Sequence, residues 1–230
     1  MLLHGFLPSL LEGASVTLAV ALCSLAVAVL LGLAGSLAKL SRSRLARAMA
    51  GAYTTLIRGV PDLVLMLLVF YGGQLGVNAL ALMLGHEEYI DIDPFVAGVL
   101  TIGFIFGAYL TEAFRGAFLA VPRGQREAGL AFGMRPLQVL WRITLPQMLR
   151  HALPGLSNNW LVLVKSTAIV SVIGLSDLMT RGQQAAGTTR EPFSFYLAVA
   201  VIYLAFTSLS ELGFAWASKR LAIGVRQGRL

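Results

Sequence analysis

The side chains able to do catalytic chemistry are few and widely separated in this sequence. The single cysteine, Cys23, lies in an apolar run, so neither an intrachain disulfide nor a cysteine metal site is expected. None of the histidines His4, His86 and His151 belongs to an H-E-x-x-H zinc pattern, and no G-x-x-x-x-G-K-[ST] phosphate loop occurs. We therefore expect no cofactor or metal on this chain. If ATP drives its activity, we expect hydrolysis on a partner chain.

Charged residues within apolar segments are the more informative feature. A charge at the centre of a membrane helix costs about 2.5–3.5 kcal/mol, so such residues usually face a bundle interior or a water-filled cavity. Glu112 has a natural partner in Arg115, three residues later on the same helix. Glu211 lies close enough to Lys219 to be explained as an interfacial charge.

Asp62 and Lys165 are stronger candidates for a substrate path. Asp62 follows Pro61 in a first helical turn, where the helix dipole favours an acid, so a local role and a functional role fit it equally. Lys165 lies too deep in its segment for its ammonium group to reach water easily. Ser166 and Thr167 add hydroxyl groups beside it. We predict a path lined by Asp62, Lys165, Ser166 and Thr167.

The elements that must position these charges are membrane helices. Of the 230 residues, 57% are apolar and 13% charged, and the mean hydropathy is +0.77. A soluble domain of this size is unable to bury so much apolar surface, whereas a membrane helix needs about 20 mainly apolar residues. The sequence predicts an all-α polytopic membrane protein, a single domain over residues 1–230. Five transmembrane helices are expected, at Ser15–Leu37, Pro61–Leu84, Phe95–Ala117, Asn159–Leu178 and Phe193–Trp216.

The basic residues predict the orientation. Fifteen of the 18 Lys and Arg residues lie after the first or fifth segment or at and after the end of the third, whereas the link between the second and third carries four acids. Because cytoplasmic loops are enriched in Lys and Arg, the N-terminus is expected outside and the C-terminus in the cytoplasm. This distribution accounts for the net charge of +7 without a nucleic-acid partner. The first segment does not read as a signal peptide, since its first basic residue, Lys39, comes after it. The four acids are Glu87, Glu88, Asp91 and Asp93.

A long loop, at about 118–158, separates the third and fourth segments. Loops of that length are uncommon and usually functional. Its apolar spacing predicts two short helices, the first over Arg123–Phe132 and the second over Leu137–Leu145, with Gly133 as the glycine that ends the first. A hairpin lying against the membrane would have the same periodicity. Four prolines divide the loop: Pro122, Pro136, Pro146 and Pro154.

Seven residues of this loop are more specific evidence than its periodicity. They are Glu127, Ala128, Gly129, Gly133, Ile143, Leu145 and Pro146. Their spacing resembles the E-A-A-x-x-x-G-(nine)-I-x-L-P motif of permeases from ATP-binding cassette (ABC) importers, with Gly129 in place of the second alanine. The resemblance implies a type I ABC importer permease fold. It also implies that the loop is a coupling helix that docks into a groove on a cytoplasmic ATPase.

Further segments look like the polar amino-acid branch of that family, and most like permeases for histidine, lysine, arginine and ornithine. They include Thr54–Gly72, Ile90–Pro94 and Thr111–Val121. The resemblance implies a bacterial inner-membrane heterodimer with a homologous permease, two copies of an ATPase, a periplasmic binding protein and a basic amino acid as substrate. Relatives often carry an acid where this chain has Ser166. The acid that recognises a cationic side chain is then expected from Asp62 or from the partner subunit.

Two other classes of membrane protein are alternatives. A scaffold or sensor subunit would use the loop to hold a cytoplasmic partner without moving solute, but it would need no polar group such as Lys165 facing a cavity. A secondary transporter usually shows an inverted repeat and broken midplane helices, and no such repeat is evident in the sequence.

Overall fold

The apolar segments fold as long helices because lipid offers the backbone no hydrogen bonds, so each segment must satisfy its own. The computed structural model describes residues 2–221, and every regular element in that range is helical. Five stretches are long and apolar enough to cross a membrane, which confirms the predicted number. They are α1 (Leu7–Leu40), α3 (Asp62–Met83), α4 (Pro94–Ala120), the unit Pro136–Ile173 built around α7 (Leu145–Ser166), and α9 (Pro192–Leu221).

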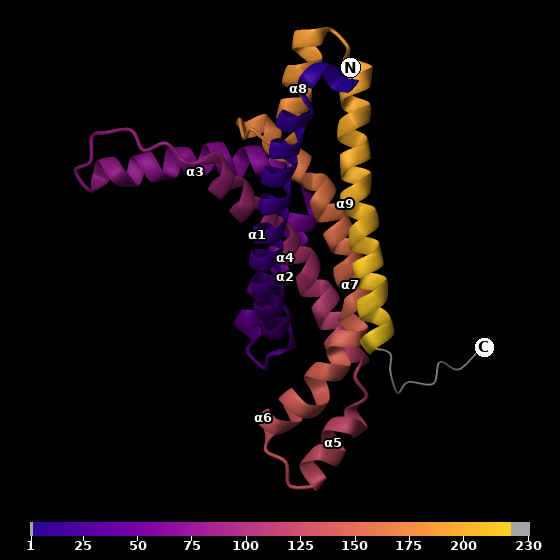
Figure 1. The fold of residues 1–230 in the computed structure, drawn as a ribbon. Helices are drawn as coiled ribbons and strands as arrows, with labels where there is room; N and C mark the ends of the chain where they lie inside the picture. The colour runs from indigo at the N-terminus through magenta and orange to yellow at the C-terminus, as the bar shows by residue number, and fades with distance from the viewer. Residues whose placement is uncertain (1, 222–230) are drawn as a thin grey trace.

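The pair α1 and α4 forms the centre of the bundle (Figure 1). Small residues let the two backbones approach closely, as is common between membrane helices. A Cβ at Gly103 would lie 2.6 Å from Cβ of Val27, and one at Gly32 would lie 2.7 Å from Cβ of Leu110. Around this pair, α7 packs against α4, and α9 packs against α7 and α8 (Leu178–Thr189).

Two helices were not predicted. α2 (Arg44–Gly59) follows α1 and packs on α1 and α4 through a narrow buried face of Ala50, Thr54 and Ile57. α8 begins at Leu178, a residue that the sequence assigned to the fourth span. The first span is also longer than expected, since α1 extends from Leu7 to Leu40.

The fourth span differs most from its prediction. The loop was expected to continue to Asn158, but α7 already begins at Leu145, and the chain is helical from Pro136 onward. Pro154, expected to interrupt a loop, lies inside α7. A proline is tolerated in a membrane helix where neighbouring helices and side chains satisfy the freed backbone groups. A 3-10 helix over Thr167–Ile173 then completes the span and ends at Gly174, with φ of +90°.

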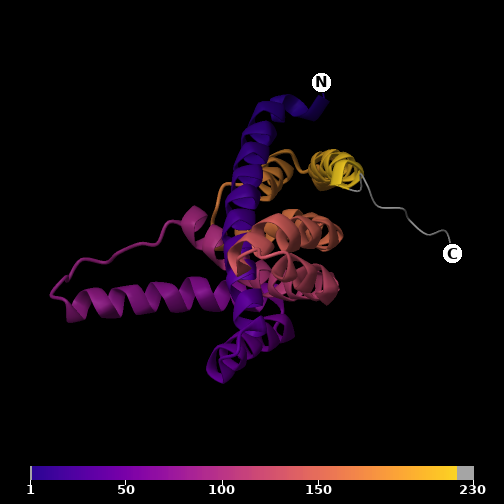
Figure 2. The same ribbon diagram turned by 90° about the horizontal axis from the view of Figure 1, so that it is seen from below.

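The helix α3 projects sideways from the bundle, across the direction of α1 and α9 (Figures 1 and 2). The link that follows runs back along it and is fixed by two amide side chains one turn apart. Asn78 accepts from Ile90 N at 2.8 Å and donates to Ile90 O at 2.9 Å, and Gln74 Oε1 accepts from Ile92 N at 2.9 Å. These bonds fix the link on either side of Asp91, and the link is called the acidic strap.

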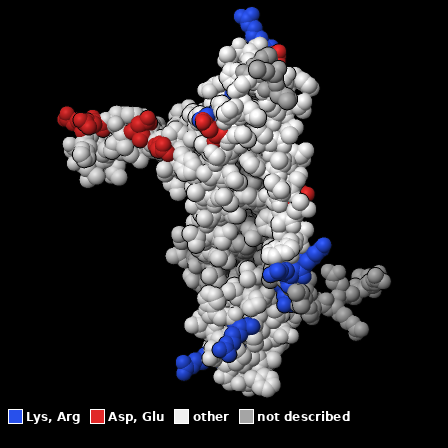
Figure 3. All heavy atoms as spheres, in the orientation of Figure 1, with Lys and Arg blue, Asp and Glu red and all other residues white. Residues whose placement is uncertain are grey.

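The charges separate as the sequence predicted. Figure 3 shows Asp and Glu gathered at the far end of the α3 arm, and Lys and Arg mainly at the lower end of the visible face. Of the basic residues counted for that end, Arg226 and Arg229 lie outside the described residues.

Candidate functional site

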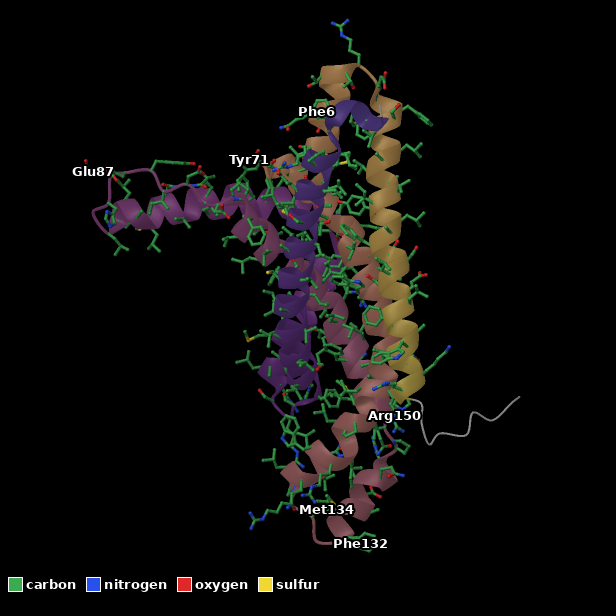
Figure 4. The ribbon with its side chains drawn as sticks, in the orientation of Figure 1. Phe6, Tyr71, Glu87, Phe132, Met134 and Arg150 are labelled. Atoms are coloured by element: carbon green, nitrogen blue, oxygen red, sulfur yellow. The ribbon has the colours of Figure 1, made fainter. Side chains whose placement is uncertain are left out.

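A helical hairpin at the lower end of the bundle contains the whole loop motif (Figure 4). Its first arm is α5 (Arg123–Ala131), in agreement with the predicted helix. Gly133 reverses the chain with φ of +75°, a conformation that glycine adopts without steric cost. The turn closes with Gly133 N donating to Leu130 O at 2.9 Å and Met134 N donating to Gly129 O at 3.1 Å.

The second arm returns to the bundle without a break. It comprises α6 (Pro136–Val139), a π-helical turn over Leu140–Thr144 and the start of α7. Gln138 Oε1 accepts from Arg135 N at 2.8 Å, which fixes the start of this arm. The widened turn comes just before Pro146, whose ring would clash with a carbonyl in a regular helix. The motif proline therefore sits where the hairpin becomes the membrane helix.

Part of the motif holds the two arms together. Gly129 is buried, and a Cβ there would lie 2.7 Å from Cδ1 of Ile143 and 3.0 Å from Cγ2 of Val139. Val139 itself is only 3% exposed. Glycine in place of the usual alanine at position 129 thus gives these side chains the room they occupy.

The outer surface of the hairpin carries large apolar side chains. Phe132 is 89% exposed, Leu137 64% and Trp141 62%. Phe132 and Met134 lie at the tip, far from the bundle, while Arg150 lies near its base (Figure 4). Large apolar side chains exposed together in this way mark a surface for a partner. Glu127, Ala128 and Pro146 are also exposed, and Leu145 is partly buried.

A polar cluster joins α1, α2 and α4 at the end of the bundle that carries the hairpin. Glu112 on α4 accepts from Lys39 Nζ of α1 and, through Oε2, from Arg115 Nε at 2.9 Å. Lys39 Nζ also donates to Thr54 Oγ1 of α2 at 2.5 Å. The predicted Glu112–Arg115 pair is confirmed, and the structure adds the link to α1 and α2.

The four predicted path residues do not form one cluster. Asp62 is the first residue of α3 and is partly buried, and no hydrogen bond or ion pair links it to Lys165 within residues 2–221. Lys165 is exposed in a cavity of about 320 Å³ between the fourth span and α9. Ser166 is partly buried, whereas Thr167 is 1% exposed and donates to Val164 O at 2.7 Å. Thr167 Oγ1 also lies 3.4 Å from the Tyr203 hydroxyl of α9.

Asp177 is a polar residue whose environment the sequence did not reveal. It caps α8, with Oδ1 accepting from Thr180 N at 2.9 Å, and it is 1% exposed. Its other oxygen is buried without a partner among the residues described. Burial raises the pKa of this carboxyl, and the bond from Thr180 lowers it only in part. An acid directly before a helix is a capping signal that would have located α8.

These features define a class of protein: a multi-pass membrane protein that presents a folded apolar hairpin to a partner. A family model described as "Binding-protein-dependent transport system inner membrane component" matches residues 28–223. The chain belongs to this family. It is a permease subunit of an ABC importer in the bacterial inner membrane, a class that works in complex with an ATPase and a substrate-binding protein.

The similar proteins are transport permeases along their full length. The histidine/lysine/arginine/ornithine transport system permease protein HisQ of Escherichia coli (strain K12) is 51% identical over 229 residues, covering 100% of both chains. The octopine transport system permease protein OccQ of Rhizobium radiobacter is 40% identical over 231 residues, covering 98% of both. A crystal structure of an amino acid ABC transporter with histidines matches with a TM-score of 0.79 and 30% identity, covering 94% of this chain and 95% of that one.

Proposed function

We propose that this chain is a permease subunit of an importer for basic amino acids. The observation that carries the proposal is the full-length 51% identity to a permease named for histidine, lysine, arginine and ornithine transport. Relatives named for octopine and arginine transport, each 40% identical, support the same substrate class. A cationic substrate is also consistent with the acidic strap on the α3 arm, although salt screens attraction over distances beyond about 8–10 Å.

The complex we propose contains a second, homologous permease subunit, two copies of the ATPase and a periplasmic binding protein. ATP binds the ATPase subunits, and this chain carries no cofactor. The two permease subunits alternate between outward and inward access as the ATPases close on ATP.

Coupling is assigned to the hairpin. Its exposed Phe132, Leu137 and Trp141 are apolar side chains of the kind that fill a groove on a partner. Glu127 and Ala128 lie on the exposed side of α5 and belong to the same docking surface. Gly129 and Ile143 act differently, since they set the angle between the two arms.

The substrate path is assigned to Asp62, Lys165, Ser166 and Thr167 together with residues of the second permease. The exposure of Lys165 within a cavity supports this role, because a free ammonium group inside a membrane protein needs a wet or ligand-filled space. The partial burial of Asp62 at the start of α3 is compatible with a place at the edge of the path.

Orientation is tested with a reporter that is active only outside the cytoplasm. Fusions after His86 in the acidic strap and after Thr188 near the end of α8 should be active, while a fusion after Arg44 should be silent. The segregation of charged residues supports this arrangement. The reverse pattern would place the hairpin outside and exclude coupling through it.

Function is tested by purifying the chain from native membranes in mild detergent and reconstituting what accompanies it. An ATPase and a homologous permease should co-purify, and proteoliposomes given the binding protein should accumulate labelled arginine on addition of ATP. Co-purification without uptake of any basic amino acid would contradict the substrate class. The absence of an ATPase would contradict the importer itself and favour a scaffold.

A further inference from the structure

The fourth span and α9 are separated on one side by two cavities. The lower one, of about 310 Å³, is lined by Ser157 and Leu161 of α7 and by Glu211 of α9. The upper one, of about 320 Å³, is lined by Lys165 of α7 and Tyr203 of α9. Each cavity is therefore lined by one charged side chain, and the two have opposite charge.

Helical periodicity places both cavities on the same seam. Ser157, Leu161 and Lys165 recur every four residues on α7, and Tyr203 and Glu211 are eight residues apart on α9, so each set shares one face of its helix. Leu161 lines the lower cavity, and Lys165 lines the upper one a single turn later, about 6 Å along the axis. Both cavities therefore lie along the same pair of antiparallel helices, and together they are called the α7–α9 groove.

Neither charge is satisfied by the protein. Within residues 2–221, no hydrogen bond or ion pair involves Lys165 or Glu211. Glu112, by contrast, is held by both Lys39 and Arg115. Ser157 and Ser218, which also line the lower cavity, have no hydrogen-bond partner among the described side chains either. A charge kept in a membrane helix without a partner is a functional site by default.

The spacing of the two charges suits a ligand with a charge at each end. Along the axes, the two residues lie within about two helical turns of each other, across helices whose axes are about 8–10 Å apart. Leu161, one turn before Lys165 on α7 and in the same cavity as Glu211, is apolar. A basic amino acid has a carboxylate at one end and an ammonium or guanidinium group at the other, joined by an apolar alkyl chain.

We propose that this α7–α9 groove is an amino-acid binding site in which Lys165 binds the substrate carboxylate and Glu211 binds the cationic side chain. The inference rests on the proposed transport of basic amino acids and specifies how this subunit would select them. Glu211 then supplies the acid that Ser166 lacks. Because Glu211 lies on α9, it is far from Lys165 in the sequence and comes near it only in the folded bundle.

A direct binding measurement without the periplasmic binding protein tests the site, because the selectivity of that protein then has no effect on the result. The purified permease–ATPase complex, in lipid nanodiscs and without the binding protein, is titrated with arginine, with citrulline and with agmatine. Citrulline has a neutral group where arginine has guanidinium, and agmatine lacks the carboxylate. Glu211→Gln should weaken arginine binding at least tenfold with little effect on citrulline. Lys165→Gln should weaken arginine at least tenfold with little effect on agmatine, because a charge-assisted hydrogen bond is lost in each case.

Two further variants exclude a general defect. Ser210→Ala alters the residue beside Glu211, whose hydroxyl donates to Phe206 O within α9 and lies outside the groove, and it should bind arginine like the wild type. Glu211→Asp keeps the charge and should retain part of the preference for arginine over citrulline. Equal loss of arginine and citrulline in Glu211→Gln, or no loss of either, would overturn the site.

The outcome for the wild type separates this site from the proposed function. A wild-type complex that imports arginine with its binding protein but binds none of the three compounds alone would exclude the groove while leaving the importer intact. A wild-type complex that imports no basic amino acid would instead contradict the proposed function.

Discussion

Replacement of Gly129 by alanine tests whether packing between the hairpin arms controls coupling. The added Cβ would lie 2.7 Å from Cδ1 of Ile143 and 3.0 Å from Cγ2 of Val139. Cδ1 is the far end of a flexible side chain and can move, but Val139 is buried and restricted to one preferred rotamer in a helix. Overpacking of a buried site costs about 1–3 kcal/mol, and the mobility of Ile143 places this case near 1–2 kcal/mol.

A matched variant separates the clash from helix propensity. Alanine is favoured over glycine in a helix by about 1 kcal/mol, which would hide part of the cost. Gly124→Ala makes the same change on α5, where no atom lies within 4 Å of the new Cβ. The difference between the two variants is then the cost of the clash. Adding Ile143→Val to Gly129→Ala removes Cδ1 and should recover part of the stability lost to the clash.

Hydrogen exchange at the Met134 amide reports the hairpin directly, because this amide donates to the Gly129 carbonyl at 3.1 Å. We expect exchange about tenfold faster in Gly129→Ala than in Gly124→Ala, since 1.4 kcal/mol is a factor of ten. Substrate-stimulated ATP hydrolysis by the reconstituted complex should be lower in Gly129→Ala than in Gly124→Ala. Equal exchange and equal ATP hydrolysis in the two variants would refute the idea that packing at Gly129 sets the docking geometry.

Three further perturbations test other parts of the structure. Gly133→Val places a β-branched residue at φ of +75° at a cost of about 1–2 kcal/mol. This variant should reach normal abundance in the membrane but lose ATP-driven uptake. Asparagine tolerates this backbone conformation, so Gly133→Asn should retain ATP-driven uptake. Burial raises the pKa of Asp177, so the folded protein holds this proton more tightly than the unfolded chain does. The free energy of unfolding therefore falls as pH rises from the pKa of the unfolded state, about 4, through the higher pKa of the folded state. Asp177→Asn keeps a capping side chain and should raise the melting temperature at neutral pH but not at acidic pH; an equal effect at both would contradict this assignment. Glu112→Gln leaves Lys39 without its carboxylate and should lower the melting temperature, whereas an unchanged value would mean that this partly exposed pair contributes little.

The membrane helices could be predicted because the bilayer imposes their length and composition. α2 and α8 lie outside that constraint. The buried face of α2 is made of small or polar residues such as Ala50 and Thr54, which leave a weak apolar pattern. The usable signals were the capping residues, Ser43 before α2 and Asp177 before α8, whose side chains accept from backbone N–H groups.

The hairpin was predictable in outline, since the helix over Arg123–Ala131 and the glycine turn at Gly133 follow from local rules. Its second arm was not. A proline within a polar stretch suggests a loop, whereas α7 runs through Pro154, as membrane helices allow where neighbouring groups satisfy the freed backbone. Spacing also gave no indication of which motif residues pack inward, because the contact of Gly129 with Ile143 depends on how the two arms fold back on each other.

The charges within the spans show the limit of local patterns most clearly. Glu112 has the predicted partner in Arg115, but also Lys39 from a helix some seventy residues earlier in the chain, because the end of α1 packs on α4. Glu112 thus has both of its ion-pair partners within this chain. Lys165 and Glu211 find no such partner within the described residues, although a membrane interior penalises them equally. Charges that one chain retains without satisfying them mark the places where a ligand or a second subunit must complete the structure, and it is there that the substrate of this permease should be sought.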